Sequence, residues 1–323
     1  MKISVIMPVY NASASLPRSL ESLRKQTFRD FEVVFVDDGS TDGSANLLAA
    51  FQEQADIPCQ ILRQGENQGV AAARNRGLDA AGGEWVTFVD ADDTIEEKAL
   101  ETALQAAAPG VDLVGWDWIL GFEKNGRTMR QADYPTALGA LKNLMGGTMR
   151  WNLWLFLFRR DLLESSHIRF IDGADMGEDM LLTIQAFLHA REVVQVHAPL
   201  YRYNAVSTSS LSRQFSPERR QEVTTNIQAV EAAVRSSRYR QDLADYLPFL
   251  KLYVKLPLLV STDRADYETW YAWFPESNPC ALRNKALPLR TRLLQGMAAR
   301  RLWAGVRLYH LLVYQLVYGL IYR

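Results

Sequence analysis

The first 116 residues alternate between two hydrophobic periodicities, and this alternation leaves few possible folds. Short, continuous apolar runs are separated by segments whose apolar residues recur at helical spacing. Continuous apolar runs are typical of strands that are buried on both faces of a parallel sheet. We expect such strands over residues 3–9, 31–36, 60–62, 84–89 and 111–116. Their alternation with helices predicts an open α/β domain in which helices cover both faces of the sheet.

Carboxylates crowd the ends of two of these strands. Asp90, Asp92 and Asp93 directly follow the fourth expected strand, and Asp37 and Asp38 follow the second. Ligands of open α/β sheets bind beyond the carboxyl ends of the strands. Neighbouring carboxylates repel one another unless a cation lies among them, and Mg²⁺ and Mn²⁺ often bind one or two carboxylates together with substrate phosphates. The pattern indicates an enzyme acting on an activated nucleotide, although a solvated acidic turn would also produce it.

Charge is distributed unevenly along the chain. The 323 residues carry a net charge of −1, which gives no general attraction to nucleic acid. No Asp or Glu follows Glu276, so the first 276 residues carry −9 and the last 47 carry +8. The two cysteines, Cys59 and Cys280, are far apart in the sequence. We therefore expect neither a disulfide framework nor a zinc site, and a reducing cytoplasm suits the chain.

Three common motifs are absent from the sequence. Residues 7–11 (MPVYN) stand where a dinucleotide-binding Rossmann domain would carry G-x-G-x-x-G after its first strand. There is no G-x-x-x-x-G-K-[ST] and no G-x-S-x-G. These absences argue against P-loop nucleotide hydrolases and α/β-hydrolases.

Four segments occur instead in a characteristic order and spacing: 5–11 (VIMPVYN), 36–44 (VDDGSTDGS), 67–75 (NQGVAAARN) and 90–93 (DADD). Together they closely resemble the GT-A glycosyltransferases of family 2, a large group of inverting enzymes that act on nucleotide sugars. The resemblance is specific over residues 1–116 and extends less specifically to about residue 210. It implies an α/β fold of the GT-A type, with a Rossmann-like, mixed and mostly parallel sheet and flanking helices.

The resemblance implies a nucleotide-binding role for several of these residues. Pro8 and Tyr10 would line the base, and Asp37 would accept a hydrogen bond from the base edge, typically that of uracil. Gly69, followed by small side chains, would let a helix approach closely, and Arg74 would lie near the nucleotide. The simpler alternatives are a turn at Asp37 and a structural salt bridge at Arg74.

The acidic segment would bind the ribose and the metal. By resemblance, Asp90 contacts the ribose, and Asp92 ligates Mg²⁺ or Mn²⁺ at the diphosphate. Asp93 could be a second ligand, but we favour a role as a charge at the start of the next helix. Thr94 and Glu97 have the spacing of a capping box, which predicts that a helix begins there.

Glu178 and Asp179 resemble the ED motif of the family, in which the aspartate deprotonates the acceptor hydroxyl. Direct displacement at the anomeric carbon needs one base opposite the leaving group and inverts the configuration. The alternative is that both acids only favour the first turn of a helix through its macrodipole. Asp175 lies close in the sequence, so the ranking of these three carboxylates stays open.

Further candidates belong to the acceptor side or to a loop. Trp151 and Trp154 lie where related enzymes often carry aromatic residues that stack on sugars, although tryptophan is also a common core residue. Arg202, together with the segment 207–210, loosely resembles a loop that closes over the diphosphate. Arg202 could equally be a surface charge.

The C-terminal end suggests contact with a membrane. Residues 308–322 lack formal charge, are rich in Leu, Val and Tyr, and follow Arg300, Arg301 and Arg307. A bilayer span needs about 20 apolar residues, so this segment is short for a span but suits the membrane interface. A helix that packs on the protein or on a second copy is the alternative.

We therefore expect a GT-A domain over residues 1–210. Residues 211–323 should form a helical, basic region that could associate with a membrane. The expected reaction is inverting transfer from a UDP-hexose or UDP-N-acetylhexosamine to a hydroxyl of a glycan or lipid-linked glycan. The expected location is cytoplasmic, peripheral on the inner face of the cytoplasmic membrane. The alternatives are a nucleotidyltransferase of related fold and a non-catalytic sugar-binding assembly protein.

Overall fold

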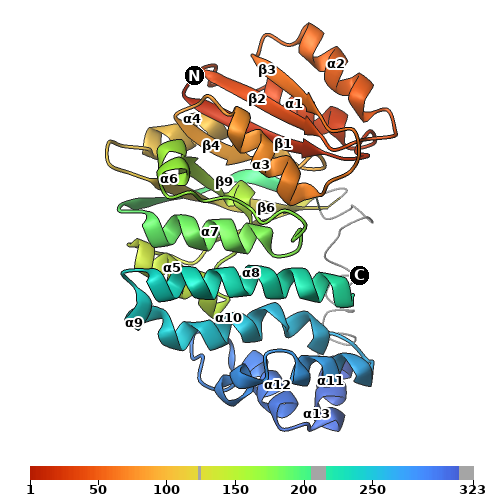
Figure 1. Cartoon of the computed structure of the whole chain (residues 1–323), viewed down its shortest axis with the longest axis vertical. Helices are drawn as coiled ribbons and strands as arrows, with labels where there is room; N and C mark the ends of the chain where they lie inside the picture. Colours follow the sequence, from red (N-terminus) through yellow and green to blue (C-terminus); the bar gives the residue numbers. More distant parts are fainter. Residues whose placement is uncertain (123–124, 205–215, 313–323) are drawn as a thin grey trace. The chain divides into compact units, whose positions relative to one another are not determined.

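The computed structural model describes residues 1–122, 125–204 and 216–312. Its strands form one sheet in the order β3–β2–β1–β4–β8–β6–β9–β5, and β7 pairs with β6 (Figure 1). The strands have the following bounds: β1 Ile3–Val9, β2 Phe31–Asp37, β3 Cys59–Arg63, β4 Trp85–Phe88, β5 Thr94–Ile95, β6 Leu113–Gly121, β7 Gly126–Met129, β8 Phe156–Arg159 and β9 Val193–Asn204.

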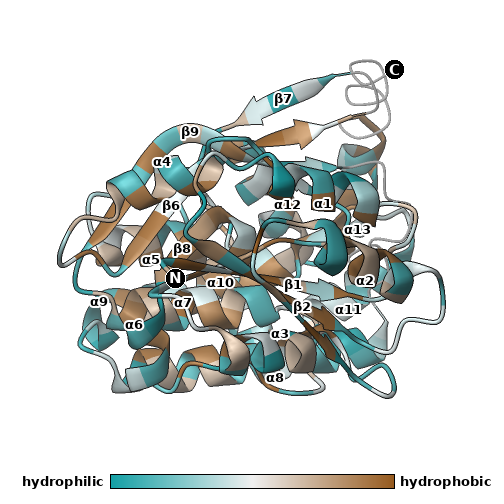
Figure 2. Cartoon of the chain, turned by 90° about the horizontal axis from the view of Figure 1, so that it is seen from above, coloured by the Kyte–Doolittle hydropathy of each residue, from teal (hydrophilic) through white to brown (hydrophobic). Residues whose placement is uncertain are grey.

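The first half of the sheet is parallel. β1 pairs in parallel with β2 and β4, and β2 pairs in parallel with β3. β8 runs antiparallel to β4 and β6, whereas β6 and β9 are parallel. β1 and β2 are almost wholly buried and appear hydrophobic in Figure 2. The prediction of a mixed, mostly parallel sheet with flanking helices is confirmed.

Strands and helices alternate as expected from β1 to β4. The α-helices have the following bounds: α1 Leu16–Arg24, α2 Ser44–Gln54, α3 Val70–Ala80, α4 Ala99–Ala106, α5 Ala137–Gly146, α6 Arg160–Ser165, α7 Glu178–His189, α8 Pro217–Ser236, α9 Arg240–Leu243, α10 Leu247–Val254, α11 Arg264–Ala272, α12 Leu289–Ala299 and α13 Trp303–Tyr309. Short 3₁₀ helices include Leu153–Leu155, just before β8.

Helix α3 packs closely on β1 and β2. Its buried face is made of small residues, including Ala71, Ala73 and Gly77. A Cβ atom at Gly77 would collide with the side chain of Ile6 on β1. The small residues therefore let α3 approach the sheet, and this brings Arg74, also buried on α3, to the carboxyl ends of the strands.

The prediction of a helix beginning at Thr94 is wrong. Thr94 and Ile95 form β5, which pairs with β9, and α4 begins only at Ala99. Thr and Ile are β-branched and favour strands, and burial of the Ile95 side chain adds to that preference. The capping role expected for Asp93 is wrong as well, because its carboxylate accepts hydrogen bonds from β9.

The chain divides into two compact units. One contains residues 1–140 and 150–233, including the sheet, and the other combines residues 141–149 with those from 234 onward. The domain boundary expected at residue 210 lies outside the described residues. Within the parts of the chain that the structure describes, no helix is both long and apolar enough to span a bilayer.

A buried lysine in the second unit donates hydrogen bonds to three acceptors between residues 273 and 278. Lys255 is fully buried, and its Nζ donates hydrogen bonds to the Trp273 carbonyl at 2.9 Å, the Phe274 carbonyl at 3.3 Å and Asn278 Oδ1 at 2.6 Å. The ammonium also lies 4.2 Å from the ring centroid of Trp270. Burial lowers the pKa of Lys255 from 10.5 to about 7, and the charge of a nearby glutamate offsets this only partly.

This pKa predicts a pH-dependent stability of the second unit. Folded Lys255 binds a proton more weakly than the unfolded chain does, so protonation favours unfolding. Stability should therefore fall as the pH drops from about 10 toward about 7, by at most about 1.4 kcal/mol per pH unit. The melting temperature of wild type minus that of Lys255→Met, measured across this range, should decrease toward pH 7. A difference that is constant with pH, or the same trend against the exposed control Lys285→Met, would contradict the assignment.

Candidate active site

The loops that follow β1 and β2 are tied together. Asn11, which adopts a left-handed conformation with φ of 47°, accepts a hydrogen bond from the Thr41 N–H at 2.8 Å. Its own N–H donates to Ser40 Oγ at 3.1 Å, and the Ser40 N–H donates to Asp37 at 3.0 Å. Tyr10, which directly precedes Asn11, has 49% of its surface exposed. The buried carboxylate of Asp37 and the exposed ring of Tyr10 thus both lie at the carboxyl edge of the sheet. Pro8 is half-buried and lies one residue before the end of β1.

Two carboxylates hold the start of α3. Asp38 is buried and accepts hydrogen bonds from the backbone N–H groups of Gln68, at 2.8 Å, and Gly69, at 3.0 Å. Asp175 accepts from the Ala71 N–H at 2.8 Å. Gly69 has a φ of 95°, and a Cβ atom there would collide with Asp175. Sequence reasoning missed the roles of Asp38 and Asp175, and Gly69 is required by the backbone whatever its role toward a nucleotide.

Arg74 joins motifs that are far apart in the sequence. Its guanidinium is 4% exposed and donates through Nη1 to Glu178 Oε1 and Asp179 Oδ1, both at 2.7 Å. Nη2 lies 3.2 Å from Asp90 Oδ1. The side chain also lies over the ring of Phe170, at 5.9 Å from its centroid. The structure therefore brings the acidic segment after β4 and the ED pair at the start of α7 into one cluster around a single cation.

The start of α7 is fixed by its neighbours. Gly177 adopts a left-handed conformation with φ of 84°, and Glu178 and Asp179 form the first turn of the helix. Asn226 on α8 donates to the carbonyls of Ala174 and Met176, each at 2.9 Å, and thereby holds the preceding loop. The helix macrodipole favours both carboxylates here. The macrodipole alone does not account for their convergence on Arg74.

The cluster perturbs the acidity of its members. Burial raises the pKa of Asp90 to about 6, and the charges of Asp179 and Asp92 add to this while Arg74 opposes it. Burial and the charge of Asp179 raise the pKa of Glu178 well above its usual range. Burial lowers the pKa of Arg74, but the attraction of Asp179, Asp90 and Glu178 outweighs this and raises it. The site is therefore rich in negative charge that one arginine only partly compensates.

The donor atoms at this edge suit a hard divalent cation. Asp92 is half-buried beside Asp90 and offers carboxylate oxygens, which Mg²⁺ and Mn²⁺ prefer. Across residues 1–122, 125–204 and 216–312, no group of three or more His, Cys, Asp or Glu side chains is arranged to hold a metal by itself. A cation at Asp92 would therefore need ligands from a bound substrate, as is usual for Mg²⁺ with phosphates.

The candidates for the acceptor side are placed differently from one another. Trp154 is buried and stacks on Tyr201, with ring centroids 4.3 Å apart and an interplanar angle of 9°. Trp151 is half-buried, and its carbonyl accepts a hydrogen bond from Thr183. Arg202 lies on β9, 3.8 Å from a carboxylate oxygen of Glu96. The loop expected over residues 207–210 lies outside the described residues. Burial favours a packing role for Trp154, and the acceptor roles stay predictions.

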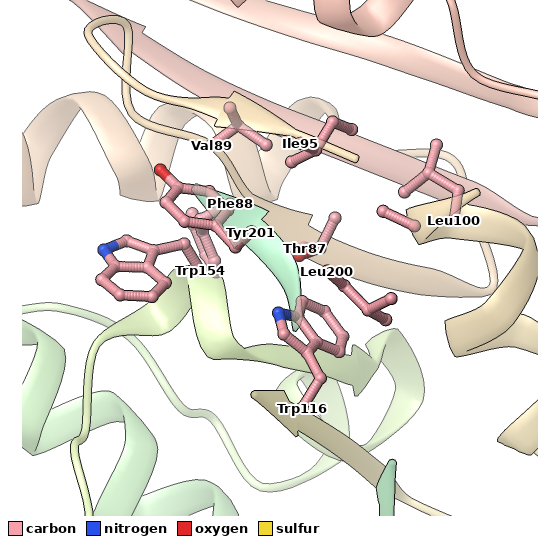
Figure 3. A pocket seen from close by; sticks show the side chains of 10 residues that line it. Thr87, Phe88, Val89, Ile95, Leu100, Trp116, Trp154, Leu200 and Tyr201 are labelled. Carbon is pink, nitrogen blue, oxygen red and sulfur yellow. The ribbon is translucent and has the colours of Figure 1, made fainter. Parts of the chain in front are cut away.

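An apolar cavity beside Trp154 is not the active site. Figure 3 shows its lining, in which Trp154 and Tyr201 lie side by side opposite Trp116 and Leu100. Its volume is about 10 Å³, with no polar surface, so it could hold one water at most and would offer it no hydrogen bond. It is a packing void lined by residues of β4, β6, β9 and α4.

Removing the central cation should destabilise the fold strongly. Arg74→Met leaves three carboxylates close together and should lower the free energy of unfolding by about 3–5 kcal/mol. Arg74→Lys should recover only part of this, because one ammonium cannot replace two Nη groups that contact different carboxylates. Urea unfolding followed by tryptophan fluorescence measures both changes. The control Arg76→Met, at an exposed position on α3, should change the value by less than about 0.5 kcal/mol. Equal effects at the two positions would contradict the central role of Arg74.

Comparison with solved structures identifies the fold. The structure of TarS residues 1–349 from S. aureus in complex with UDP-GlcNAc superposes with a TM-score of 0.74 at 21% identity, covering 98% of this chain and 92% of that one. The mannosyltransferase PcManGT from Pyrobaculum calidifontis, in complex with GDP-Man and Mn²⁺, gives a TM-score of 0.57 at 21% identity over 96% of this chain and 85% of that one. These similarities support the GT-A fold.

Sequence comparison gives the family. The putative glycosyltransferase EpsH of Bacillus subtilis is 34% identical over 219 residues, which are 65% of this chain and 63% of EpsH. The chain thus spans less than two thirds of that relative's length. Residues 4–177, more than half of the chain, match the model of glycosyl transferase family 2. The chain belongs to glycosyl transferase family 2 and has its GT-A fold.

Proposed function

We propose that this protein transfers a sugar from a nucleotide sugar, a UDP-hexose or UDP-N-acetylhexosamine, to a hydroxyl of a glycan or lipid-linked glycan, with inversion. The observation that carries the proposal is the contact of Arg74 with Asp90 on one side and with Glu178 and Asp179 on the other. It brings a donor-side carboxylate and a candidate base together at the carboxyl ends of the strands. The UDP-GlcNAc in the TarS structure supports the choice of nucleotide.

The donor would bind along the edge already described. Pro8, Tyr10 and Asp37 would hold the base, and Asp90 would hold the ribose. Asp92, together with the diphosphate, would hold Mg²⁺ or Mn²⁺. The cation supplies Lewis-acid stabilisation of the charge that develops on the leaving diphosphate. The Mn²⁺ in the PcManGT structure supports this choice of cofactor.

Asp179 is the carboxylate that we assign as the general base. Asp175 already accepts the Ala71 N–H, so its part is to hold α3. Burial and the neighbouring charge raise the pKa of Glu178 and favour its protonated form, which cannot accept a proton. We therefore assign the base to Asp179, the aspartate of the ED pair. Arg74 would orient both carboxylates. Membership of family 2 argues against the nucleotidyltransferase alternative.

A donor panel tests this assignment. Release of nucleoside diphosphate from a set of nucleotide sugars with Mn²⁺ should identify one preferred donor. Asp92→Ala should abolish its turnover, because the metal loses its protein ligand. Asp179→Asn should lower kcat by about 10²–10⁴-fold while leaving UDP binding intact. Asp56→Asn, at an exposed position, is the matched control. Full turnover by Asp179→Asn would exclude it as the base, and the absence of UDP binding to wild type would exclude the donor-binding proposal.

We also propose that the C-terminal unit docks on an anionic lipid surface, which would put the enzyme beside a lipid-linked acceptor. On α12, Leu289 and Leu293 share one face and are 60% and 50% exposed. The same face continues at Gly296, which Leu282 covers, and at Arg300, which is exposed. This stripe of leucines and arginine is typical of helices that lie in a membrane interface.

Exposed cations lie close to the stripe in the sequence. Arg283, Lys285 and Arg290 are exposed close to it in sequence, and no acidic residue follows Glu276. Each cation near an anionic surface could contribute about 1 kcal/mol to binding. The remainder of the expected membrane segment, from residue 313 onward, lies outside the described residues.

Vesicle binding tests the lipid proposal. Wild type should co-sediment with phosphatidylglycerol vesicles and much less with phosphatidylcholine vesicles. Leu289→Glu with Leu293→Glu should weaken binding by at least about tenfold, because two anchors are lost and two negative charges are added. Val260→Glu, at another exposed apolar position, is the control and should bind better than the double variant. Unchanged binding by the double variant would show that this face of α12 does not contact lipid, and a wild type that dimerises through it would favour a second copy as its partner.

A further inference from the structure

Hydrogen bonds within the turn, from α1 and from β9 hold the turn that carries Asp90 and Asp92. Within the turn, the Asp93 N–H donates to the Asp90 carbonyl at 3.1 Å. From α1, Ser19 Oγ lies 2.9 Å from the Ala91 carbonyl and 2.6 Å from that of Asp93. Ser19 is itself fully buried. The turn is thus anchored to α1 through its backbone and not through the carboxylates that face the ligand edge.

β9 holds the other side of the turn. Tyr201 Oη accepts a hydrogen bond from the Asp90 N–H at 3.2 Å and donates to Asp93 Oδ2 at 2.8 Å. The Asn204 N–H donates to Asp93 Oδ1 at 2.7 Å, and Asn204 Nδ2 donates to the Asp92 carbonyl at 2.9 Å. In Figure 3 the Tyr201 oxygen points away from the apolar cavity, while its ring remains against Trp154. Tyr201 and Asn204 of β9 therefore contact Asp90, Asp92 and Asp93 of the acidic turn.

Asp93 differs from its acidic neighbours in burial. It is fully buried, whereas Asp90 and Asp92 are only partly buried. Both of its oxygens are used by Tyr201 and Asn204, so it faces β9 and cannot also face a substrate. Burial raises its pKa, and the charges of Asp90 and Asp92 raise it further. Burying an acid beside two others is costly, and the hydrogen bonds from Tyr201 and Asn204 offset part of this cost.

We propose that Asp93, Tyr201 and Asn204 form a positioning clamp that fixes the turn so that Asp92 meets the metal and the diphosphate in one geometry. Residues that orient metal ligands through hydrogen bonds commonly change metal affinity by 10–100-fold when they are altered. The clamp would hold the turn in its binding conformation before the metal and the diphosphate arrive. Binding would then cost less conformational entropy. The inference rests on the proposed function, because it takes Asp92 as the metal ligand.

Binding of Mn²⁺ in the presence of UDP tests the clamp. Tyr201→Phe removes one hydroxyl and keeps the ring that stacks on Trp154. Its Mn²⁺ affinity, measured by titration calorimetry well below the melting temperature, should be about 10-fold weaker than that of wild type. Asn204→Ala, which keeps the backbone contact to Asp93 but loses the contact to the Asp92 carbonyl, should weaken it in the same direction. Tyr134→Phe is the control, since Tyr134 is a buried tyrosine of the same unit whose ring packs on Phe187.

The outcomes are distinct. Weaker Mn²⁺ binding in Tyr201→Phe and Asn204→Ala, with Tyr134→Phe like wild type, supports the clamp even if melting temperatures fall. Lower melting temperatures with unchanged Mn²⁺ and UDP affinity would show that the network serves folding only, and would overturn the inference while the proposed function stands. Failure of wild type to bind UDP with Mn²⁺ would overturn the proposed function and, with it, the inference.

Discussion

A single buried cation, Arg74, contacts three carboxylates that come from two distant parts of the sequence. The guanidinium reaches Asp90 after β4 and both Glu178 and Asp179 at the start of α7. Burying the guanidinium is expensive, and it is tolerable because the charge meets three partly buried carboxylates through hydrogen bonds. This pairing fixes the distance between the donor side and the proposed base, so the chemistry at the sheet edge depends on it.

The surrounding structure keeps this charged cluster in place. Small residues let α3 approach β1 closely enough to bring Arg74 inward, and Asp38 and Asp175 hold the start of that helix. Hydrogen bonds from Ser19, Tyr201 and Asn204 hold the acidic turn. Burial and like charges oppose the ionisation of Asp90 and raise its pKa, so keeping this carboxylate charged costs free energy. Such cost is common where a site is shaped in advance for a cation and an anionic ligand.

Local patterns in the sequence predict the strands β1 to β4 and β6, and fail where distant residues decide. The strands β1 to β4 follow from apolar runs that need no partner to be recognised. The strands β5, β7, β8 and β9 are not among those expected from the sequence. Thr94 and Ile95, for example, form a strand through pairing with β9. The ED pair and the acidic turn were identified separately, but their common contact with Arg74 depends on how α3 packs. The role of Asp93 was misassigned for the same reason, since its partners lie more than a hundred residues away.

Arg74 and Asp179 are coupled through the direct contact between Nη1 and Oδ1. A double-mutant cycle of Arg74→Met and Asp179→Asn, scored by the free energy of unfolding in urea, measures this coupling directly. We expect an interaction energy of at least about 1 kcal/mol, because removing Asp179's charge relieves the repulsion that Arg74→Met creates. Changes that add to within about 0.5 kcal/mol would contradict the claim, since residues that do not interact behave in that way.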